Sequence, residues 1–269
     1  MIQLICSDID GTLLNKERQL SDKTIASIKR LSDIPFILIS SRMPKAMIHL
    51  QQELGITNLP MIAYNGGLII DNGSVLDSTE IDMDITKSIA NFCADTEIHL
   101  SLYHKDEWFV PAMDYWAKRE ENNTKVTPTV NPILKTIKKW KSEEKGAHKI
   151  MCMGDENEID SLVSFIEKNF DKTIIGYRSK PTYLEISHKS ISKKTAIKTV
   201  LKVKYPSIKM ENIMAFGDNY NDIEMLKNVG VGVAVKNAKL EVLKIVKHNT
   251  ESNVNGGVAL FLDNYFTTK

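Results

Sequence analysis

The sequence has few of the features that mark secreted or membrane-spanning proteins. Its 269 residues include only three cysteines, at positions 6, 93 and 152, and they form no CxxC pair. An odd and scattered set argues against a disulfide framework, so we expect Cys6, Cys93 and Cys152 to be buried as small apolar side chains. No apolar run approaches the ~20 residues that a membrane-spanning helix needs. The N-terminus lacks the basic region that begins a signal peptide.

The sequence also has no large excess of charge of either sign. Lysine and arginine number 35 against 34 aspartates and glutamates, which gives a net charge of +1. Such a balance provides no long-range field for collecting nucleic acid or an anionic membrane. The six histidines contain no HxxxH pair, so a zinc site is not expected. We therefore expect a cytoplasmic protein, a monomer or weak homo-oligomer, whose partner is a small molecule.

What is present is an alternation of apolar strands and amphipathic helices at both ends of the chain. Residues 2–7 and 35–40 are continuous apolar runs, and residues 22–31 between them have helical apolar spacing. The pattern returns after residue 194, with a strand at residues 213–216. Apolar strands alternating with helices indicate a parallel sheet covered on both faces. The fold class predicted is therefore α/β, with a Rossmann-like doubly wound core.

The middle of the chain has a different pattern of expected strands and helices. Strand-like runs there outnumber helices, and all three tryptophans, Trp108, Trp116 and Trp140, fall within it. We expect an inserted α+β domain at residues 83–186, with the core formed by residues 1–82 and 187–269. Two of its segments are expected to carry no chemistry. The mixed charges of residues 135–145 indicate a solvated surface, and Asp155, after an apolar strand, is predicted to cap a helix.

Two acidic clusters carry the main chemical signal. Asp8 and Asp10 follow the first strand, and Asp218 and Asp222 follow the strand at residues 213–216. The carboxyl ends of parallel strands form one edge of the sheet, where α/β proteins bind ligands. Strand alternation would point Asp8 and Asp10 the same way. Carboxylates that lie close together repel one another unless a cation lies between them, and an all-oxygen ligand set favours Mg²⁺.

Three further residues could hold an anion at the same edge. Ser40 and Ser41 end the second strand and precede a helix, so a hydroxyl and a backbone N–H are available there. Lys193 begins a helix of the returning core and would offset phosphoryl charge, although its neighbour Lys194 leaves the register open. An ordinary serine cap and a solvated lysine are the common alternatives for such residues.

Together these segments resemble the haloacid dehalogenase superfamily of phosphatases, specifically its Cof-type branch with a C2B cap. The resemblance lies in four segments in the family's order: DxDGT at residues 8–12, residues 40–42, ISK at residues 191–193 and GDNxND at residues 217–222. Residues 64–67, Asn237 and Asn253 resemble further signatures of the family. The departures are Ser41, Lys194 and Lys236, each where the family usually has glycine. None of them removes a catalytic group.

The resemblance implies a role for each matching residue. Asp8 would be the nucleophile, and Asp10 the general acid and then the general base. The Asp8 carboxylate, the Asp10 backbone carbonyl and Asp218 would bind Mg²⁺, with Asp222 just behind them. The phosphoryl oxygens would be held by Ser40, Ser41, Lys193 and Asn221. The activity implied is hydrolysis of a small phosphorylated metabolite, such as a sugar phosphate, through an aspartyl-phosphate. A phosphomutase or other phosphotransferase, or a non-catalytic binding protein on the same scaffold, remains an alternative.

Overall fold

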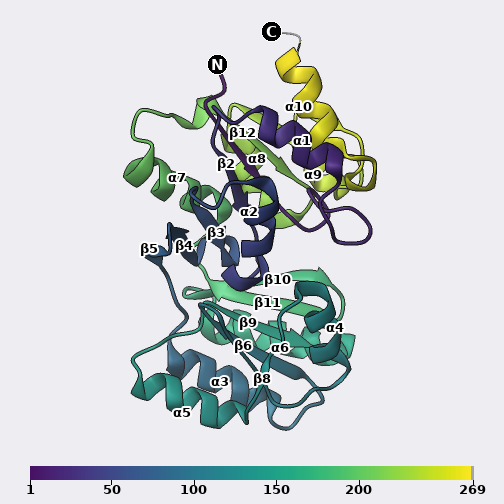
Figure 1. The fold of residues 1–269 in the computed structure, drawn as a ribbon. Helices are drawn as coiled ribbons and strands as arrows, with labels where there is room; N and C mark the ends of the chain where they lie inside the picture. The colour runs from purple at the N-terminus through teal and green to yellow at the C-terminus, as the bar shows by residue number, and fades with distance from the viewer. Residues whose placement is uncertain (268–269) are drawn as a thin grey trace. The chain divides into compact units, whose positions relative to one another are not determined.

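The computed structural model describes residues 1–267, apart from the side chain of Ser179, and the chain divides into two units. The first unit comprises Met1–Ser41, Met47–Asp77 and Ser192–Lys269, and the second comprises Arg42–Ala46 and Ser78–Ile191. Figure 1 shows the elements of both units along the chain. The expected inserted domain of residues 83–186 lies within the second unit, which extends beyond it at both ends.

The first unit is built on an eight-stranded sheet of order β14-β13-β12-β1-β2-β3-β4-β5. The pairs from β14 to β3 are parallel, and β4 runs antiparallel to β3. The central strands are buried along their whole length, which explains why their sequences are continuously apolar. The predicted doubly wound α/β core is confirmed. The strands are β1 (Leu4–Ser7), β2 (Phe36–Ile39), β3 (Met61–Ala63), β4 (Leu68–Asp71), β5 (Ser74–Ser78), β12 (Ile213–Gly217), β13 (Val231–Val235) and β14 (His248–Thr250).

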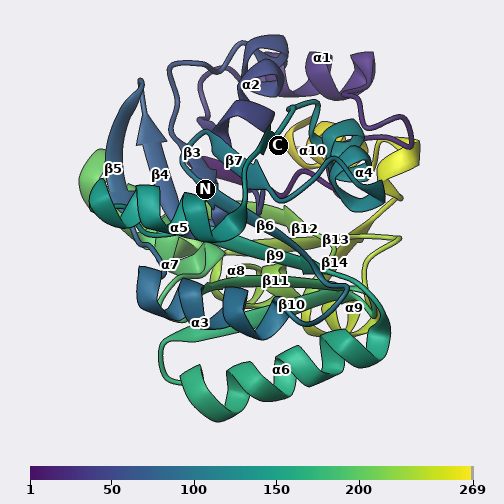
Figure 2. The same ribbon diagram turned by 90° about the horizontal axis from the view of Figure 1, so that it is seen from below.

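Two groups of helices cover this sheet. α1 contacts α2 and α10, whereas α8 contacts α7 and α9. Figure 2 shows α1 and α2 on one side of the strands and α8 and α9 on the other. Local signals fix where the helices begin; for example, the Ser21 hydroxyl accepts a hydrogen bond from Thr24 N at 3.1 Å and caps α1. The helices are α1 (Asp22–Arg30), α2 (Ile48–Leu54), α7 (Lys193–Lys204), α8 (Ile223–Asn228), α9 (Leu240–Ile245) and α10 (Gly257–Thr267).

The second unit is a six-stranded sheet of order β10-β11-β9-β6-β7-β8, antiparallel except for the β7–β8 pair. α3 contacts both α5 and α6, and apolar side chains from these helices and the sheet form one core. The strands are β6 (His99–His104), β7 (Glu107–Val110), β8 (Thr129–Val130), β9 (Lys149–Met153), β10 (Ile174–Lys180) and β11 (Tyr183–His188). The helices are α3 (Met83–Cys93), α4 (Tyr115–Thr124), α5 (Ile133–Ser142) and α6 (Glu156–Phe170).

The expectation that residues 135–145 form a solvated surface is confirmed for most of the charged side chains but is wrong for the segment as a whole. Most of this segment belongs to α5, whose Thr136, Ile137 and Trp140 are buried. Their spacing places them on one face of the helix, while the lysines lie on the other, so mixed charge did not exclude an amphipathic helix. Two other expectations are confirmed: all three cysteines are buried and free, and the Asp155 carboxylate caps α6 by accepting from Asn157 N at 2.9 Å.

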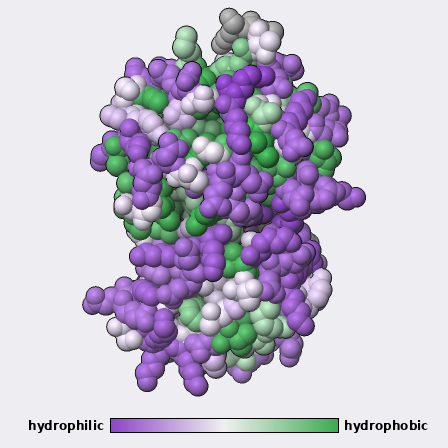
Figure 3. All heavy atoms as spheres, in the orientation of Figure 1, coloured by the Kyte–Doolittle hydropathy of each residue, from purple (hydrophilic) through white to green (hydrophobic). Residues whose placement is uncertain are grey.

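Among residues 1–267, no helix is both long enough and apolar enough to cross a bilayer. The face in Figure 3 is covered mainly by hydrophilic residues, with hydrophobic ones scattered among them. Isolated exposed side chains of this kind, such as Val203 at 55% exposure, are ordinary for a folded protein.

The burial of β2 leads to a stability prediction. Ile37 is 0% exposed at the centre of the first unit's sheet, so Ile37→Ala removes buried methyl groups and leaves a cavity. We expect the free energy of unfolding to fall by about 3 kcal/mol in urea denaturation followed by circular dichroism. The matched control Val203→Ala is expected to change it by less than ~0.5 kcal/mol. Equal effects of the two substitutions would contradict this packing.

Candidate active site

Neighbouring strands bring the two predicted acidic clusters together. β1 and β12 are parallel, with Ser7 beside Phe216, and Asp8 N donates to Phe216 O at 3.0 Å. The side chains of Asp8, Asp218 and Asp222 each offer an oxygen, and these oxygens lie within 4.8 Å of one another. Residues far apart in the sequence therefore form one carboxylate cluster at the carboxyl edge of the sheet, as the strand order requires.

Lys193 is the cation in this cluster. Its ammonium group donates to Asp8 Oδ1 at 2.5 Å and to Asp222 Oδ1 at 2.6 Å, and the residue is 0% exposed. It is the first residue of α7, whose N-cap is Ser192, so the helix start fixes its direction. The adjacent Lys194 instead donates to Glu224 Oε1 at 2.6 Å. The structure thus places Lys193, and not Lys194, among the buried carboxylates.

Asp222 holds the cluster in place. Its Oδ2 accepts hydrogen bonds from Asp218 N at 2.9 Å and from Asn219 N at 3.0 Å, while Oδ1 accepts from Lys193. Gly217 makes this approach possible, because a Cβ there would lie 2.5 Å from Asp222 Cγ. Both oxygens of Asp222 are therefore committed to protein groups, and its role is to fix Lys193 and the backbone before α8.

Asp218 faces the turn that follows Asp8. Thr12 Oγ1 donates to Asp218 Oδ1 at 3.0 Å. Gly11, at φ +83°, lets this turn pass close to Asp218, because a Cβ there would lie 2.5 Å from Asp218 Oδ2. At this position glycine is required both for the left-handed backbone and for the space. Gly11 and Thr12, the last two residues of the DxDGT segment, thus pack against Asp218.

Asp10 differs from Asp8 in its surroundings. β1 ends at Ser7 and Asp10 lies in a turn, so the alternation expected to align the two side chains does not extend to it. The Asp10 carboxylate is 40% exposed and pairs with Arg18 Nη1 at 3.2 Å. Arg18 was not predicted as a site residue; the structure alone brings it to Asp10. Asp8 is therefore a buried carboxylate, and Asp10 is one that solvent reaches.

The predicted anion-binding residues lie at the ends of adjacent elements. Ser40 directly follows β2, the neighbour of β1, and its backbone donates to Ile62 O at 3.0 Å and accepts from Asn65 N at 2.8 Å. Ser41 follows and is partly exposed. Asn221 donates through Nδ2 to Asn65 Oδ1 at 2.9 Å, which links the GDNxND segment to this group. In the sequence, Asn65 stands out only as part of the segment at residues 64–67.

Two asparagines near the carboxyl end hold the loop that follows Asp10. Asn237 Nδ2 donates to Gly11 O at 2.7 Å, and Asn253 Nδ2 donates to Leu14 O at 2.7 Å. The two are joined, because Asn253 N donates to Asn237 Oδ1 at 2.9 Å. The sequence marked both residues as signatures but gave no indication of these contacts. They position the loop after Asp10 without touching the carboxylate cluster.

The electrostatics of the cluster fit a divalent cation. Burial raises the pKa of Asp8, and although Lys193 opposes this, Asp222 and Asp218 add to it. Burial and the Asp222 charge raise the pKa of Asp218 to about 7. Burial alone would lower the pKa of Lys193, but Asp222 and Asp8 outweigh it and raise that pKa. Three carboxylates thus share one ammonium group, and an additional hard cation bound by their oxygens would relieve the repulsion.

This arrangement predicts opposite outcomes for two neighbouring lysines. Lys193→Met leaves buried carboxylates without their cation, so we expect the free energy of unfolding to fall by about 3 kcal/mol. Lys194→Met breaks only a surface pair with Glu224 and is expected to cost less than ~0.5 kcal/mol. Urea denaturation without divalent cations measures both. A larger loss in Lys194→Met would show that the assignment of the buried lysine is wrong.

Comparison with known proteins agrees with the fold and the motifs. Residues 5–262 match the family described as haloacid dehalogenase-like hydrolases. A Haemophilus influenzae protein assigned to the phosphatases is 30% identical over 99% of both chains. The 5-amino-6-(5-phospho-D-ribitylamino)uracil phosphatase YitU of Bacillus subtilis is 26% identical over 98% of this chain and 97% of its own.

Solved structures share the whole fold. A haloacid dehalogenase-like hydrolase from Bacteroides thetaiotaomicron has a TM-score of 0.89 at 24% identity, covering 99% of this chain and 100% of that one. The subclass IIB sugar phosphatase BT4131 has a TM-score of 0.81 at 21% identity, covering 98% and 99%. The resemblance predicted from the motifs is confirmed: the chain belongs to the haloacid dehalogenase-like hydrolase family.

Proposed function

We propose that the protein is a Mg²⁺-dependent phosphatase that hydrolyses a small phosphorylated metabolite through an aspartyl-phosphate on Asp8. The observation that carries this proposal is the buried Asp8 carboxylate, which accepts a hydrogen bond from the Lys193 ammonium and lies in one cluster with the Asp218 and Asp222 carboxylates. A carboxylate held rigidly beside cationic groups suits attack on a phosphoryl group, because phosphoryl transfer depends mainly on positioning and charge neutralisation.

In the first step, an oxygen of Asp8 attacks phosphorus, and the bond between phosphorus and the leaving oxygen breaks. Asp10 donates a proton to that oxygen, so the product leaves as an alcohol. The exposure of Asp10 suits this role, because a group that solvent reaches can exchange its proton between steps. Arg18, which pairs with Asp10, would fix the direction of its carboxylate.

In the second step, water attacks the phosphorus of the aspartyl-phosphate. Asp10 accepts a proton from the water, the bond between Asp8 and phosphorus breaks, and inorganic phosphate is released. The same carboxyl group therefore acts as acid in one step and as base in the other. Asp8 returns to its carboxylate form, ready for another substrate.

Magnesium would be held by the Asp8 carboxylate, the Asp10 backbone carbonyl and Asp218. When bound, it would neutralise charge on the transferring phosphoryl group. Asp222 would support this site from behind, since both of its oxygens are occupied by Lys193 and by the backbone.

The phosphoryl oxygens would be bound by donors around Asp8. Ser40 would offer its hydroxyl, Ser41 its backbone N–H and Lys193 its ammonium group. Asn221, already fixed by Asn65, would add a side-chain amide. Lys193 contacts Asp8 directly, so it would follow the phosphoryl group through both steps.

The substrate class we propose is a cytoplasmic sugar phosphate or a similar metabolite, with residues 83–186 acting as a cap that selects it. The names of two similar proteins support this class: YitU acts on a phosphoribityl compound, and BT4131 is a sugar phosphatase. Monoester hydrolysis is supported over phosphoryl transfer between sugars, because the relatives reported above are phosphatases by name.

The role of Asp8 predicts the loss of turnover in Asp8→Asn. An amide oxygen is a poor nucleophile, so we expect kcat for p-nitrophenyl phosphate to fall by at least ~10³-fold, a typical loss when a covalent nucleophile is removed. Asp155→Asn is the matched control, because Asp155 also follows a strand but only caps α6. It should retain activity. Undiminished turnover in Asp8→Asn would refute the proposed mechanism.

The role of the cation predicts reversible loss of activity on chelation. EDTA followed by dialysis should abolish phosphate release, and added Mg²⁺ should restore it. Asp218→Asn removes a charged oxygen ligand and should raise the Mg²⁺ concentration that gives half-maximal activity at least ~10-fold, which corresponds to one weakened ligand. Activity that persists after chelation, or unchanged Mg²⁺ dependence in Asp218→Asn, would contradict this assignment.

A further inference from the structure

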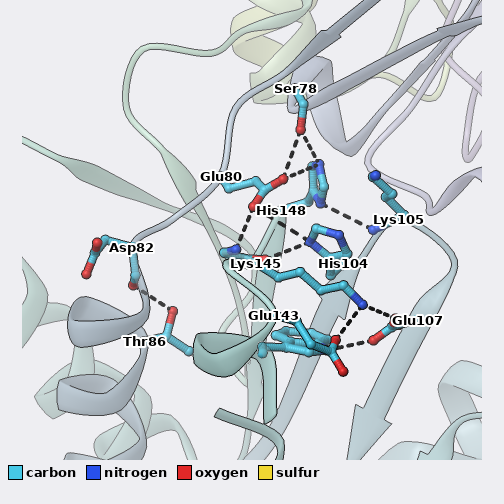
Figure 4. Close-up of polar contacts among 12 residues, drawn as sticks. Ser78, Glu80, Asp82, Thr86, His104, Lys105, Glu107, Glu143, Lys145 and His148 are labelled. Carbon is cyan, nitrogen blue, oxygen red and sulfur yellow. Dashed lines mark hydrogen bonds and ion pairs between the residues drawn. The ribbon is translucent and has the colours of Figure 1, made fainter. Parts of the chain in front are cut away.

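A second candidate ligand cluster lies entirely within the second unit, whereas the acidic cluster belongs to the first. It consists of Glu80, His104 and His148, whose ligand atoms lie within 4.8 Å of one another. Spacing in the sequence gave no sign of it, because the three residues belong to separate segments. Figure 4 shows their side chains pointing toward one another from three neighbouring stretches of chain.

Backbone pairing places the three residues in one row. An antiparallel bridge joins Ile81 to Ala147, so the preceding Glu80 lies opposite the following His148. β6 and β9 are antiparallel with Tyr103 beside Lys149, and His148 N donates to Tyr103 O at 2.8 Å. His104 therefore lies opposite His148 on its other side. Residues directly opposite across antiparallel strands present their side chains on the same face, so this row is built by the fold.

The distances within the row suit a small cation. His148 Nε2 lies 3.7 Å from Glu80 Oε1, and His104 Nδ1 lies 3.7 Å from Glu80 Oε2. The two imidazole rings have centroids 4.9 Å apart. Ligands about 2.1 Å from a tetrahedral zinc ion are separated by ~3.4 Å, so small side-chain movements would bring these groups into place.

The neighbouring groups orient the two rings. His104 Nδ1, the nitrogen that lies near Glu80, also donates to Gly146 O at 2.8 Å, so binding a cation through Nδ1 would move its proton to Nε2 and exchange this hydrogen bond for a metal–ligand bond. His148 Nδ1 accepts from Lys105 N at 3.2 Å. Binding through His148 Nε2 would move its proton to Nδ1 and exchange this one long hydrogen bond for a metal–ligand bond.

An oxygen and an entry path complete the arrangement. Ser78 Oγ lies 3.0 Å from both His148 Nε2 and Glu80 Oε1, next to the position of a bound ion. Glu80 and Gly146 also line a groove of about 380 Å³ in the second unit. The same groove is lined by Asp82, Asp84 and Glu144 and also by Lys141 and Lys145, so acidic side chains outnumber basic ones there and the balance of charge favours a cation.

We propose that Glu80, His104 and His148 form a binding site for Zn²⁺ or a similar divalent transition metal. Two imidazole nitrogens and one carboxylate are ligands that favour zinc over magnesium. The bound ion would join the segment that follows β5 to β6 and to the start of β9, so its role would be to stabilise the second unit. It takes no part in the proposed phosphatase chemistry.

Zinc binding by the metal-stripped full-length chain tests the proposal. Excess Mg²⁺ is present to occupy the acidic cluster of the first unit. Zinc affinity is measured by competition with a chromophoric chelator, and the ligand types are read from the absorption bands of bound Co²⁺. We expect one zinc site, and Co²⁺ bands typical of nitrogen and oxygen ligands. Zn²⁺ should also raise the melting temperature of the second unit.

Substitutions identify the ligands. Glu80→Gln, His104→Asn and His148→Asn should each lower zinc affinity by more than ~10-fold and abolish the Co²⁺ bands. Glu80→Gln is the variant least prone to misfold, because the Glu80 side chain is 26% exposed. Circular dichroism checks that all three variants are folded. His248→Asn, at an exposed histidine in the first unit, should bind zinc as the wild type does. The proposal would be overturned if each of the three variants bound zinc as tightly as the wild type, or if the wild type bound no zinc.

Discussion

The Lys193 ammonium lies between the carboxylates of Asp8 and Asp222, and this buried contact organises the site. Parallel strands place their carboxyl ends together, so the acidic residues that follow β1 and β12 must share one edge. One ammonium cannot balance three carboxylates. Burial, and then repulsion from the neighbouring carboxylates, raises the pKa values of Asp8 and Asp218. The proposed cation and the phosphoryl group would therefore bind where charge compensation is most needed.

The first unit could be predicted from the sequence because its strands are buried on both faces and its helices alternate with them. Asn72 and Gly73 form the β4–β5 turn with positive φ values, which these two residue types adopt readily. The elements that escaped prediction had weak local signals. α4 buries few apolar residues, the charges of α5 obscured its buried face, and β14 is only three residues long. Their structure depends on partners from other parts of the chain.

The candidate site was predictable where residues follow a strand directly. Asp8 and Asp218 could be placed at the sheet edge by that rule, and the start of α7 placed Lys193. Contacts between distant loops could not be predicted in this way. The hydrogen bonds of Asn237 and Asn253 to the loop after Asp10 depend on three-dimensional arrangement. The Glu80–His104–His148 row depends on strand register, which sequence spacing does not encode.

Chemical trapping would show whether Asp8 carries the phosphoryl group, as we propose. Enzyme mixed with a phosphoester and Mg²⁺ is quenched in acid during turnover and treated with borohydride, which reduces an acyl phosphate to an alcohol. We expect homoserine at position 8 in the mass-spectrometric peptide map, in a substrate-dependent yield. Homoserine at another carboxylate, or an unmodified Asp8 in enzyme quenched during a pre-steady-state burst of product, would contradict the proposal.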